Sequence, residues 1–157
     1  MTTVAIAIGS NLGNRAEAIA FAAARLSALL SNFRIADTIE TWPVGEGVED
    51  QNLYLNAVAI GDTELAPREL LVSLLAIEQA YGRQRSAPNA ARTLDLDLIL
   101  SGDAVIAEAD LEVPHPRFRE RFFVLGPLAE IGPDLVDPVS GMRVAELLRR
   151  LLRDENR

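Results

Sequence analysis

Hydrophobic and polar residues recur with two different periods along this chain, and the changes of period mark the predicted elements. Val4–Gly9 is a short apolar run that predicts a buried strand, and the turn residues Asn11–Asn14 can cap an alanine-rich helix that runs to about Leu30. Phe33–Ile39 and Tyr54–Ile60 predict two further strands, the second with partial alternation. The first part of the chain is therefore expected to fold as strand, helix, strand and strand.

A second helix and a fourth strand are predicted next. Pro67 suits the first turn of a helix whose apolar positions recur at helical spacing, and Gly82 suits its end. Thr93–Leu100 then predicts a strand. The order β-α-β-β-α-β is that of a ferredoxin-like α+β sandwich, in which helices cover one face of an antiparallel sheet. A C-terminal extension with its own helix, about Val144–Leu152, is expected to add a further layer.

Size and composition predict a single domain over residues 1–157. Of the 157 residues, 49% are hydrophobic and 24% are charged, as in an ordinary globular domain. The formal net charge of −8 argues against a protein that chiefly binds nucleic acid. The lack of cysteine excludes a disulfide framework and a thiolate metal site, and the apolar N-terminal run is too short for a membrane span. We therefore expect a cytoplasmic protein with no membrane association.

Every one of the fifteen basic residues is arginine, which excludes a lysine-dependent phosphate loop. A compositional bias of the genome would explain this usage, but six arginines gather in two turn-rich stretches, 83–92 and 117–121, where guanidinium groups can clamp phosphate oxygens. Neither stretch has an apolar periodicity that would pin it to the core, so both are expected to be open until a ligand binds. The six residues are Arg83, Arg85, Arg92, Arg117, Arg119 and Arg121.

Two carboxylates interrupt the apolar run of the fourth strand. Alternate side chains of a strand share a face, so Asp95 and Asp97 are expected to point one way and Leu94, Leu96 and Leu98 into the core. Neighbouring carboxylates repel unless cations neutralise them, and such oxygen ligands suit magnesium held partly by water and substrate phosphates. The alternative is a solvated strand face with two ordinary aspartates.

Four other residues with polar side chains are candidate binding residues. His115, the only histidine, lies between two prolines and before three arginines, where it can donate to a phosphate oxygen or make a structural hydrogen bond. Tyr54 and Asn56 share a strand face, which suits a heterocycle site or a cross-strand aromatic pair beside a turn. Glu78 lies on the apolar stripe of its helix, either as a surface acid or as a partly buried partner for an arginine.

In this order the motifs resemble those of the 6-hydroxymethyl-7,8-dihydropterin pyrophosphokinase family over essentially the whole chain. The resemblance implies transfer of pyrophosphate from ATP to the hydroxymethyl group of 6-hydroxymethyl-7,8-dihydropterin, with release of AMP, in folate biosynthesis. The R-T-L-D-L-D sequence is highly specific to the family. The segments that carry the resemblance are Ala5–Gly13, Tyr54–Ala57, Arg92–Ile99 and Val113–Arg117, together with Arg121 and Phe123.

The resemblance also implies a role for each site residue. Asp95 and Asp97 would hold two magnesium ions, and Arg83 and Arg92 would join them as catalytic residues. Tyr54 and Phe123 would enclose the pterin ring, and Glu78 matches an acidic position near the site. The residues implied to bind the pterin are Thr41, Val44, Tyr54, Asn56 and Phe123. Those implied to bind ATP are Arg83, Arg85, Arg92, Leu98, His115 and Arg121.

Two other functions account for part of the pattern. A non-catalytic ferredoxin-like module that binds a small metabolite and regulates a partner explains the fold and the loops, but it leaves Asp95 and Asp97 without a purpose. An enzyme of the same pathway that handles dihydroneopterin would need no ATP. Release of AMP that depends on both pterin and magnesium distinguishes the pyrophosphokinase from both alternatives.

Overall fold

The computed structural model describes residues 1–41, 53–85 and 94–155, without the side chains of 83–85. Its main sheet is antiparallel in the order β2-β4-β1-β5, and a short strand, β3, pairs with the other end of β4. This is the predicted ferredoxin-like arrangement, with its second strand divided into β2 and β3. The strands are β1 (Thr2–Ser10), β2 (Ser31–Ile35), β3 (Ile39–Thr41), β4 (Tyr54–Thr63) and β5 (Asp95–Ser101).

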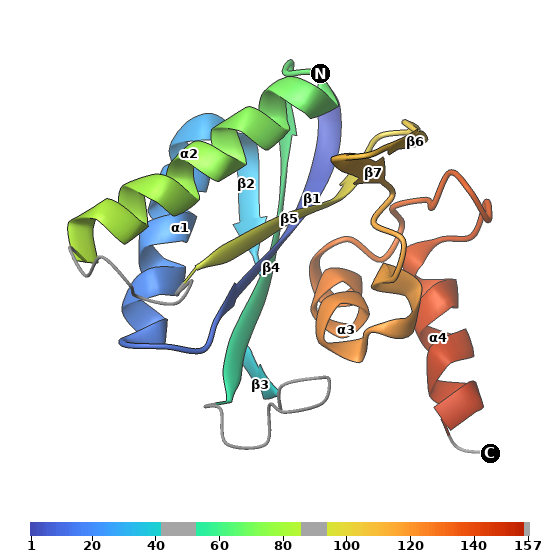
Figure 1. Cartoon of the computed structure of the whole chain (residues 1–157). Helices are drawn as coiled ribbons and strands as arrows, with labels where there is room; N and C mark the ends of the chain where they lie inside the picture. The colour runs from blue at the N-terminus through green and yellow to red at the C-terminus, as the bar shows by residue number, and fades with distance from the viewer. Residues whose placement is uncertain (42–52, 86–93, 156–157) are drawn as a thin grey trace.

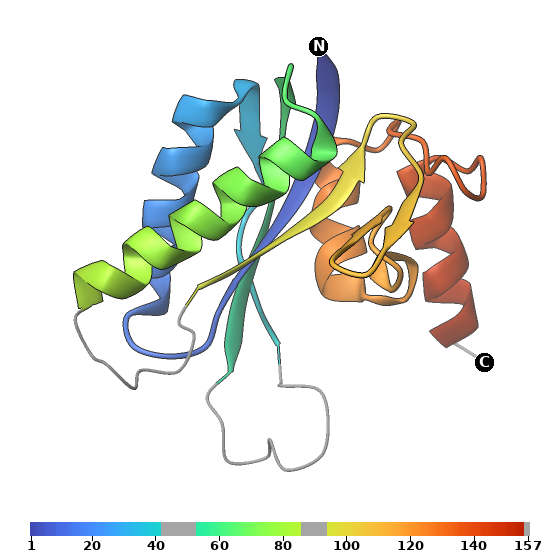
Figure 2. The same cartoon turned by 45° about the horizontal axis from the view of Figure 1, so that its top comes forward.

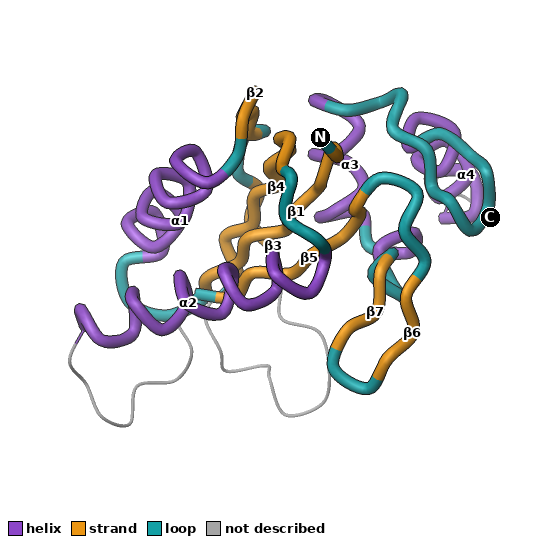
Figure 3. The backbone as a smooth tube through the Cα atoms, turned by 90° about the horizontal axis from the view of Figure 1, so that it is seen from above, coloured by secondary structure: helices purple, strands orange, loops and turns teal. Residues whose placement is uncertain are grey.

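Helices cover both faces of the sheet: one pair forms the layer expected of a ferredoxin-like sandwich, and the C-terminal part of the chain adds the further layer that the sequence predicts. Figure 1 shows α1 and α2 on one side and α3 and α4 on the other, and the views in Figures 2 and 3 keep the same separation. A short β-hairpin and a 3-10 turn, η1, connect β5 to α3. The helices are α1 (Arg15–Leu29), α2 (Pro67–Arg85), α3 (Phe122–Ile131) and α4 (Val144–Glu155), and the connecting elements are β6 (Ile106–Glu108), β7 (Leu111–Val113) and η1 (Phe118–Glu120).

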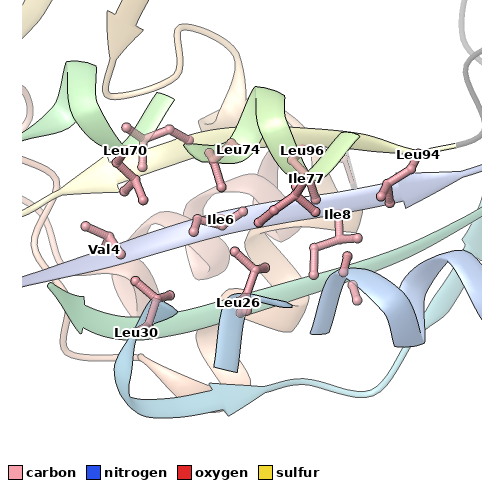
Figure 4. Packing of buried hydrophobic residues seen from close by; sticks show 14 of the residues in the cluster. Val4, Ile6, Ile8, Leu26, Leu30, Leu70, Leu74, Ile77, Leu94 and Leu96 are labelled. Atoms are coloured by element: carbon pink, nitrogen blue, oxygen red, sulfur yellow. The ribbon is translucent and has the colours of Figure 1, made fainter. Parts of the chain in front are cut away.

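The larger core lies between the sheet and the pair α1 and α2. Alternate residues of each strand enter it, as the two-residue period of a strand requires. Val4, Ile6 and Ile8 of β1 meet apolar residues of both helices there, and Figure 4 shows these side chains packed between the ribbons. Leu94, Leu96 and Leu98 point into this core, so the predicted facing of the fourth strand is confirmed.

A second core lies on the opposite face, between the sheet and α3. Ala5, Val58 and Ile60 pack there with Leu125 and Leu128 of α3, and α4 packs behind α3. Sequence reasoning predicts the C-terminal helix but not α3. Gly126 and Pro127 lie inside α3 and interrupt the pattern that would have identified it.

The predicted second strand and the predicted end of the second helix differ from the structure. The strand expected at Phe33–Ile39 is divided, because β2 ends at Ile35 and β3 begins at Ile39. Helix α2 continues past Gly82 to Arg85 because Gly82 does not adopt the left-handed conformation of a helix-ending glycine. The predicted cap of α1 is confirmed, since the side chain of Asn14 accepts a hydrogen bond from the backbone N–H of Glu17 at 3.0 Å. Within the described residues, no helix is long and apolar enough to cross a membrane.

Candidate active site

Polar residues of neighbouring strands form rows across the α3 face of the sheet. Gly9 of β1 is paired with Asn56 of β4 on one side and with Asp95 of β5 on the other. In the same way, Ala7 of β1 is paired with Asp97 of β5. Because paired residues project from the same face, the amide and both carboxylates are brought together over the small residues of β1.

Helix α3 covers the apolar part of this face and leaves the polar part open as a cavity of about 610 Å³. The segment between β7 and α3 forms its far wall. The volume lies within the range of small-molecule sites, about 300–1,000 Å³. Residues lining it include Gly9, Thr41, Tyr54, Asn56, Asp95, Asp97, His115, Arg117, Glu120, Arg121, Phe122 and Phe123.

Asn56 has a fixed orientation at one end of the cavity. Its Nδ2 donates to the hydroxyl of Thr41 at 2.9 Å and to the backbone carbonyl of Ile39 at 3.4 Å. A carbonyl only accepts, so the nitrogen must face Ile39, and Oδ1 faces the other way, toward Gly9. Asn56 is nearly buried, with 7% of its surface exposed. Its amide therefore offers the cavity an acceptor, next to the ring of Tyr54.

His115 lies at the other end of the cavity in a defined protonation state. Its backbone N–H donates to the carbonyl of Ile99 at 2.9 Å, and its Nδ1 accepts from the backbone N–H of Arg117 at 3.2 Å. Burial lowers the pKa of His115, the charge of Asp97 opposes this shift, and that of Arg121 adds to it. The imidazole is therefore neutral near pH 7, and since Nδ1 is an acceptor, its proton is on Nε2. His115 can therefore act as an uncharged hydrogen-bond donor to a phosphate oxygen.

Asp95 and Asp97 both line the cavity, as their spacing predicts. Asp95 is half-buried and Asp97 is exposed. No group of three or more histidine, aspartate or glutamate side chains in the described parts of the chain is placed to hold a metal ion. Two open carboxylates without a protein cage fit magnesium, which keeps several water or phosphate oxygens in its shell.

Glu78 does not line the cavity but reaches the strand that carries these aspartates. Its Oε2 accepts a hydrogen bond of 2.6 Å from the backbone N–H of Leu96, which lies between Asp95 and Asp97. Strand β5 pairs only with β1 among the described strands, so this amide points away from the sheet. Glu78 is therefore a partner of the β5 backbone, a role that sequence reasoning did not consider.

The arginines of the 117–121 stretch do not all face the cavity. Arg117 and Arg121 line it, and Arg117 is paired with Glu120 at 2.7 Å. Arg119 is instead bound to the buried carboxylate of Asp137, so its predicted role as a phosphate clamp is wrong. Phe118 is fully buried, which also contradicts the expectation that nothing pins this stretch to the core.

Aromatic side chains meet the arginines at the start of α3. The guanidinium carbon of Arg121 lies 5.8 Å from the ring centre of Phe123, so a residue predicted to bind ATP touches one predicted to bind the pterin. Phe122 also lines the cavity, with 46% of its surface exposed. Its ring lies against Gly126, where an added Cβ would be 3.2 Å away. The exposed ring of Phe122 is therefore available to a ligand in the cavity.

Several predicted residues cannot be compared with this geometry. Val44 and Arg92 lie outside the described residues, as do the side chains of Arg83 and Arg85. The side chain of Leu98 packs in the core beneath α1 and α2, on the face opposite the cavity.

Comparisons with known proteins agree with the resemblance. The family model for 7,8-dihydro-6-hydroxymethylpterin-pyrophosphokinase (HPPK) matches residues 5–133. A Haemophilus influenzae protein named 2-amino-4-hydroxy-6-hydroxymethyldihydropteridine pyrophosphokinase is 40% identical over 153 residues, which cover 96% of this chain and 93% of that protein. A Synechocystis protein of the same name is 49% identical over 98 residues, or 62% of this chain and half of that protein.

The fold agrees with solved structures as well. The Plasmodium falciparum protein described as wild-type HPPK-DHPS superimposes with a TM-score of 0.74 at 14% identity, over 97% of this chain and 45% of that one. At this identity the likeness concerns the fold alone. The chain thus spans about half the length of some relatives and nearly the full length of others.

Proposed function

Because this chain belongs to the 7,8-dihydro-6-hydroxymethylpterin-pyrophosphokinase family, we propose that it transfers pyrophosphate from ATP to the hydroxymethyl group of 6-hydroxymethyl-7,8-dihydropterin. The site of this reaction would be the cavity between the sheet and α3. The observation that carries the proposal is the row of Asn56, Gly9 and Asp95, which sets a heterocycle-binding amide beside a carboxylate pair. The reaction belongs to folate synthesis, and we propose the cytoplasm as its compartment.

The pterin would lie at the Asn56 end of the cavity. Tyr54 and Phe123 present aromatic rings to its faces, and Asn56 Oδ1 is available to accept from an N–H at its edge. Thr41 holds the Asn56 amide in this orientation through its hydroxyl. Val44 completes the pterin-binding set that the family resemblance implies.

ATP would lie along the wall formed by His115 and Arg121. The neutral His115 offers its Nε2–H to a phosphate oxygen, and Arg121 supplies a fixed positive charge. Arg83, Arg85 and Arg92 are proposed to add further positive charge, with Leu98 contributing through its backbone. Alignment and charge neutralisation are the main contributions of a protein to phosphoryl chemistry.

Asp95 and Asp97 would hold magnesium between the two substrates. We propose two ions, which would neutralise the ATP phosphates and orient the β-phosphorus for attack. The pterin hydroxymethyl oxygen would then lose its proton to water and form a bond to the β-phosphorus, and AMP would leave with the oxygen that bridged the α- and β-phosphorus atoms. The carboxylates contribute by fixing this geometry on a rigid strand.

An AMP-release assay tests the proposal. The protein is incubated with ATP, magnesium and the pterin alcohol, and AMP and pterin diphosphate are measured by chromatography. Equal amounts of both products, formed only when the pterin and magnesium are present, are expected. Binding of the pterin without AMP release would instead identify a non-catalytic binding module.

A further inference from the structure

A fully buried carboxylate lies behind the ATP-facing wall, the side of the cavity formed by His115 and Arg121. In sequence, it follows the segment that the family model matches. Asp137 has no exposed surface, and it follows residue 133, where that match ends. It accepts hydrogen bonds from Arg119 Nε at 2.5 Å and Arg119 Nη2 at 2.9 Å, from the backbone N–H of Val139 at 3.0 Å, and from the Ser140 hydroxyl at 2.7 Å. Its charge is therefore fully compensated inside the protein.

Arg119 is held by this carboxylate on the side away from the cavity. Its guanidinium carbon also lies 4.7 Å from the ring centre of the buried Phe118. Arg117 and Arg121, two residues before and after it, both line the cavity. Arg119 and its two neighbouring arginines therefore lie on opposite sides of the turn.

The turn that carries these arginines has little regular structure of its own. Its backbone hydrogen bonds are long, 3.4 Å from Phe118 to His115, 3.2 Å from Glu120 to Arg117 and 3.3 Å from Arg121 to Phe118. Backbone bonds of this length hold a turn weakly. The side-chain contacts of Arg119 and Phe118 are an additional restraint that ties the turn to the interior.

We propose that Asp137 is a positioning residue for the ATP-facing wall, which it braces through Arg119. The inference rests on the proposed function of His115 and Arg121 as ATP-binding residues. A buried ion pair is a poor source of net stability, because desolvating two charges offsets much of their attraction, and a role in fixing one conformation accounts better for it. The pair also gives the C-terminal extension a function, since it ties the loop before α4 to the active-site wall.

Two variants of the pair and one control test the brace. Asp137→Asn keeps the volume and removes the charge, and Arg119→Lys keeps the charge but loses the two-pronged contact. Asp134→Asn is the control, because Asp134 is an 84% exposed partner of Arg143 in the same extension. Calorimetry with magnesium and α,β-methylene-ATP measures the ATP side, and calorimetry with the pterin alcohol measures the other side. Circular dichroism establishes the temperature range in which each variant is folded.

The two ligands should respond differently. A hydrogen bond to a charged group contributes about tenfold or more to binding, so Asp137→Asn is expected to weaken binding of the ATP analogue about tenfold or more and that of the pterin less than about twofold. Arg119→Lys should show a smaller loss of the same kind, and it provides the decisive comparison if Asp137→Asn does not fold. The control should bind both ligands as the wild type does.

Other outcomes contradict the inference in distinguishable ways. If folded Asp137→Asn and Arg119→Lys bind both ligands normally, or lose both equally, Asp137 is a structural residue only and the brace is wrong. A wild-type protein that binds neither ligand would contradict the proposed function itself, and with it the premise of the brace.

Discussion

The substitution Gly9→Ala is expected to have opposite effects on the stability of the fold and on ligand binding in the cavity. Gly9 is in the centre of the polar row, and an added Cβ would lie 3.6 Å from Asn56 Oδ1 and 3.8 Å from Tyr54 Cδ1. Both are ordinary van der Waals distances, and Gly9 does not have a positive φ. The methyl group is therefore tolerated by the protein, but it projects into the space above the row.

The expected effect on stability is favourable. Alanine has fewer unfolded conformations than glycine, and where the native backbone accepts it the free energy of unfolding rises by about 0.4–1 kcal/mol. The expected effect on the pterin has the opposite sign. One additional methyl-sized group in a fitted pocket changes binding by about 1–3 kcal/mol, which corresponds to about 10–200-fold. Because the two effects oppose each other, a folding defect cannot imitate the result.

Urea unfolding measures the first effect, and calorimetry with the pterin alcohol measures the second. Gly82→Ala is the matched control, because Gly82 is in α2 and, apart from its chain neighbours and the adjoining helix backbone, no atom of the described residues lies within 4 Å of its added Cβ. It should gain stability without losing pterin affinity. If Gly9→Ala binds the pterin as tightly as the wild type, the ring does not lie over this row. If Gly9→Ala is less stable than the wild type, the space observed around Gly9 is wrong.

Three further predictions concern single residues. Asp97→Asn should fold normally but nearly abolish AMP release, because it removes one charge from the proposed metal site at constant volume; wild-type release would exclude that site. Phe123→Ala should weaken pterin binding by about 1–3 kcal/mol, the worth of one stacked base, and binding of the ATP analogue far less; equal losses in calorimetry would make Phe123 a core residue. For Asp137, burial opposes ionisation, but hydrogen bonds from Arg119 and other donors outweigh it and lower the pKa from 3.8 to about 2. The ionised Asp137 contributes about 2 kcal/mol to the free energy of unfolding above about pH 4, and this contribution is lost as the pH falls toward 2. Between about pH 4 and about pH 2, the free energy of unfolding measured in urea should therefore fall more steeply for the wild type than for Asp137→Asn.

The parts of the site that lie on strands were predictable from the sequence. The two-residue period of a strand fixes which side chains share a face, so Asp95 and Asp97 could be assigned to one surface before the surface was known. The same period placed Tyr54 and Asn56 together. What the period does not give is the register between strands. That Gly9 lies between Asn56 and Asp95 depends on pairing across the sheet, which only the structure supplies.

The wall opposite the sheet was not predictable in the same way. Arg117, Arg119 and Arg121 alternate in sequence like neighbours on one face, but η1 and the buried Asp137 divide them between the cavity and the interior. Asp137 is eighteen residues from Arg119 and gives no periodic signal of its own. The prediction of a single domain over residues 1–157 stays a prediction.

The small side chains of β1, the strand between β4 and β5, explain how one face of the sheet can both pack against α3 and form a ligand cavity. Where β1 passes under α3 and the cavity, its residues on that face are Ala5, Ala7 and Gly9, which are among the smallest residues. Ala5 lies in the core under α3, and Ala7 and Gly9 line the cavity. Because no long side chain rises from the middle strand, the strands on either side form the walls of a trough, with β4 contributing the amide and aromatic ring and β5 the carboxylates. The depth of the cavity therefore depends on β1, although β1 contributes no functional side chain to it. Substitutions of Ala7 or Gly9 by larger residues should change ligand affinity more than many substitutions at the rim of the cavity.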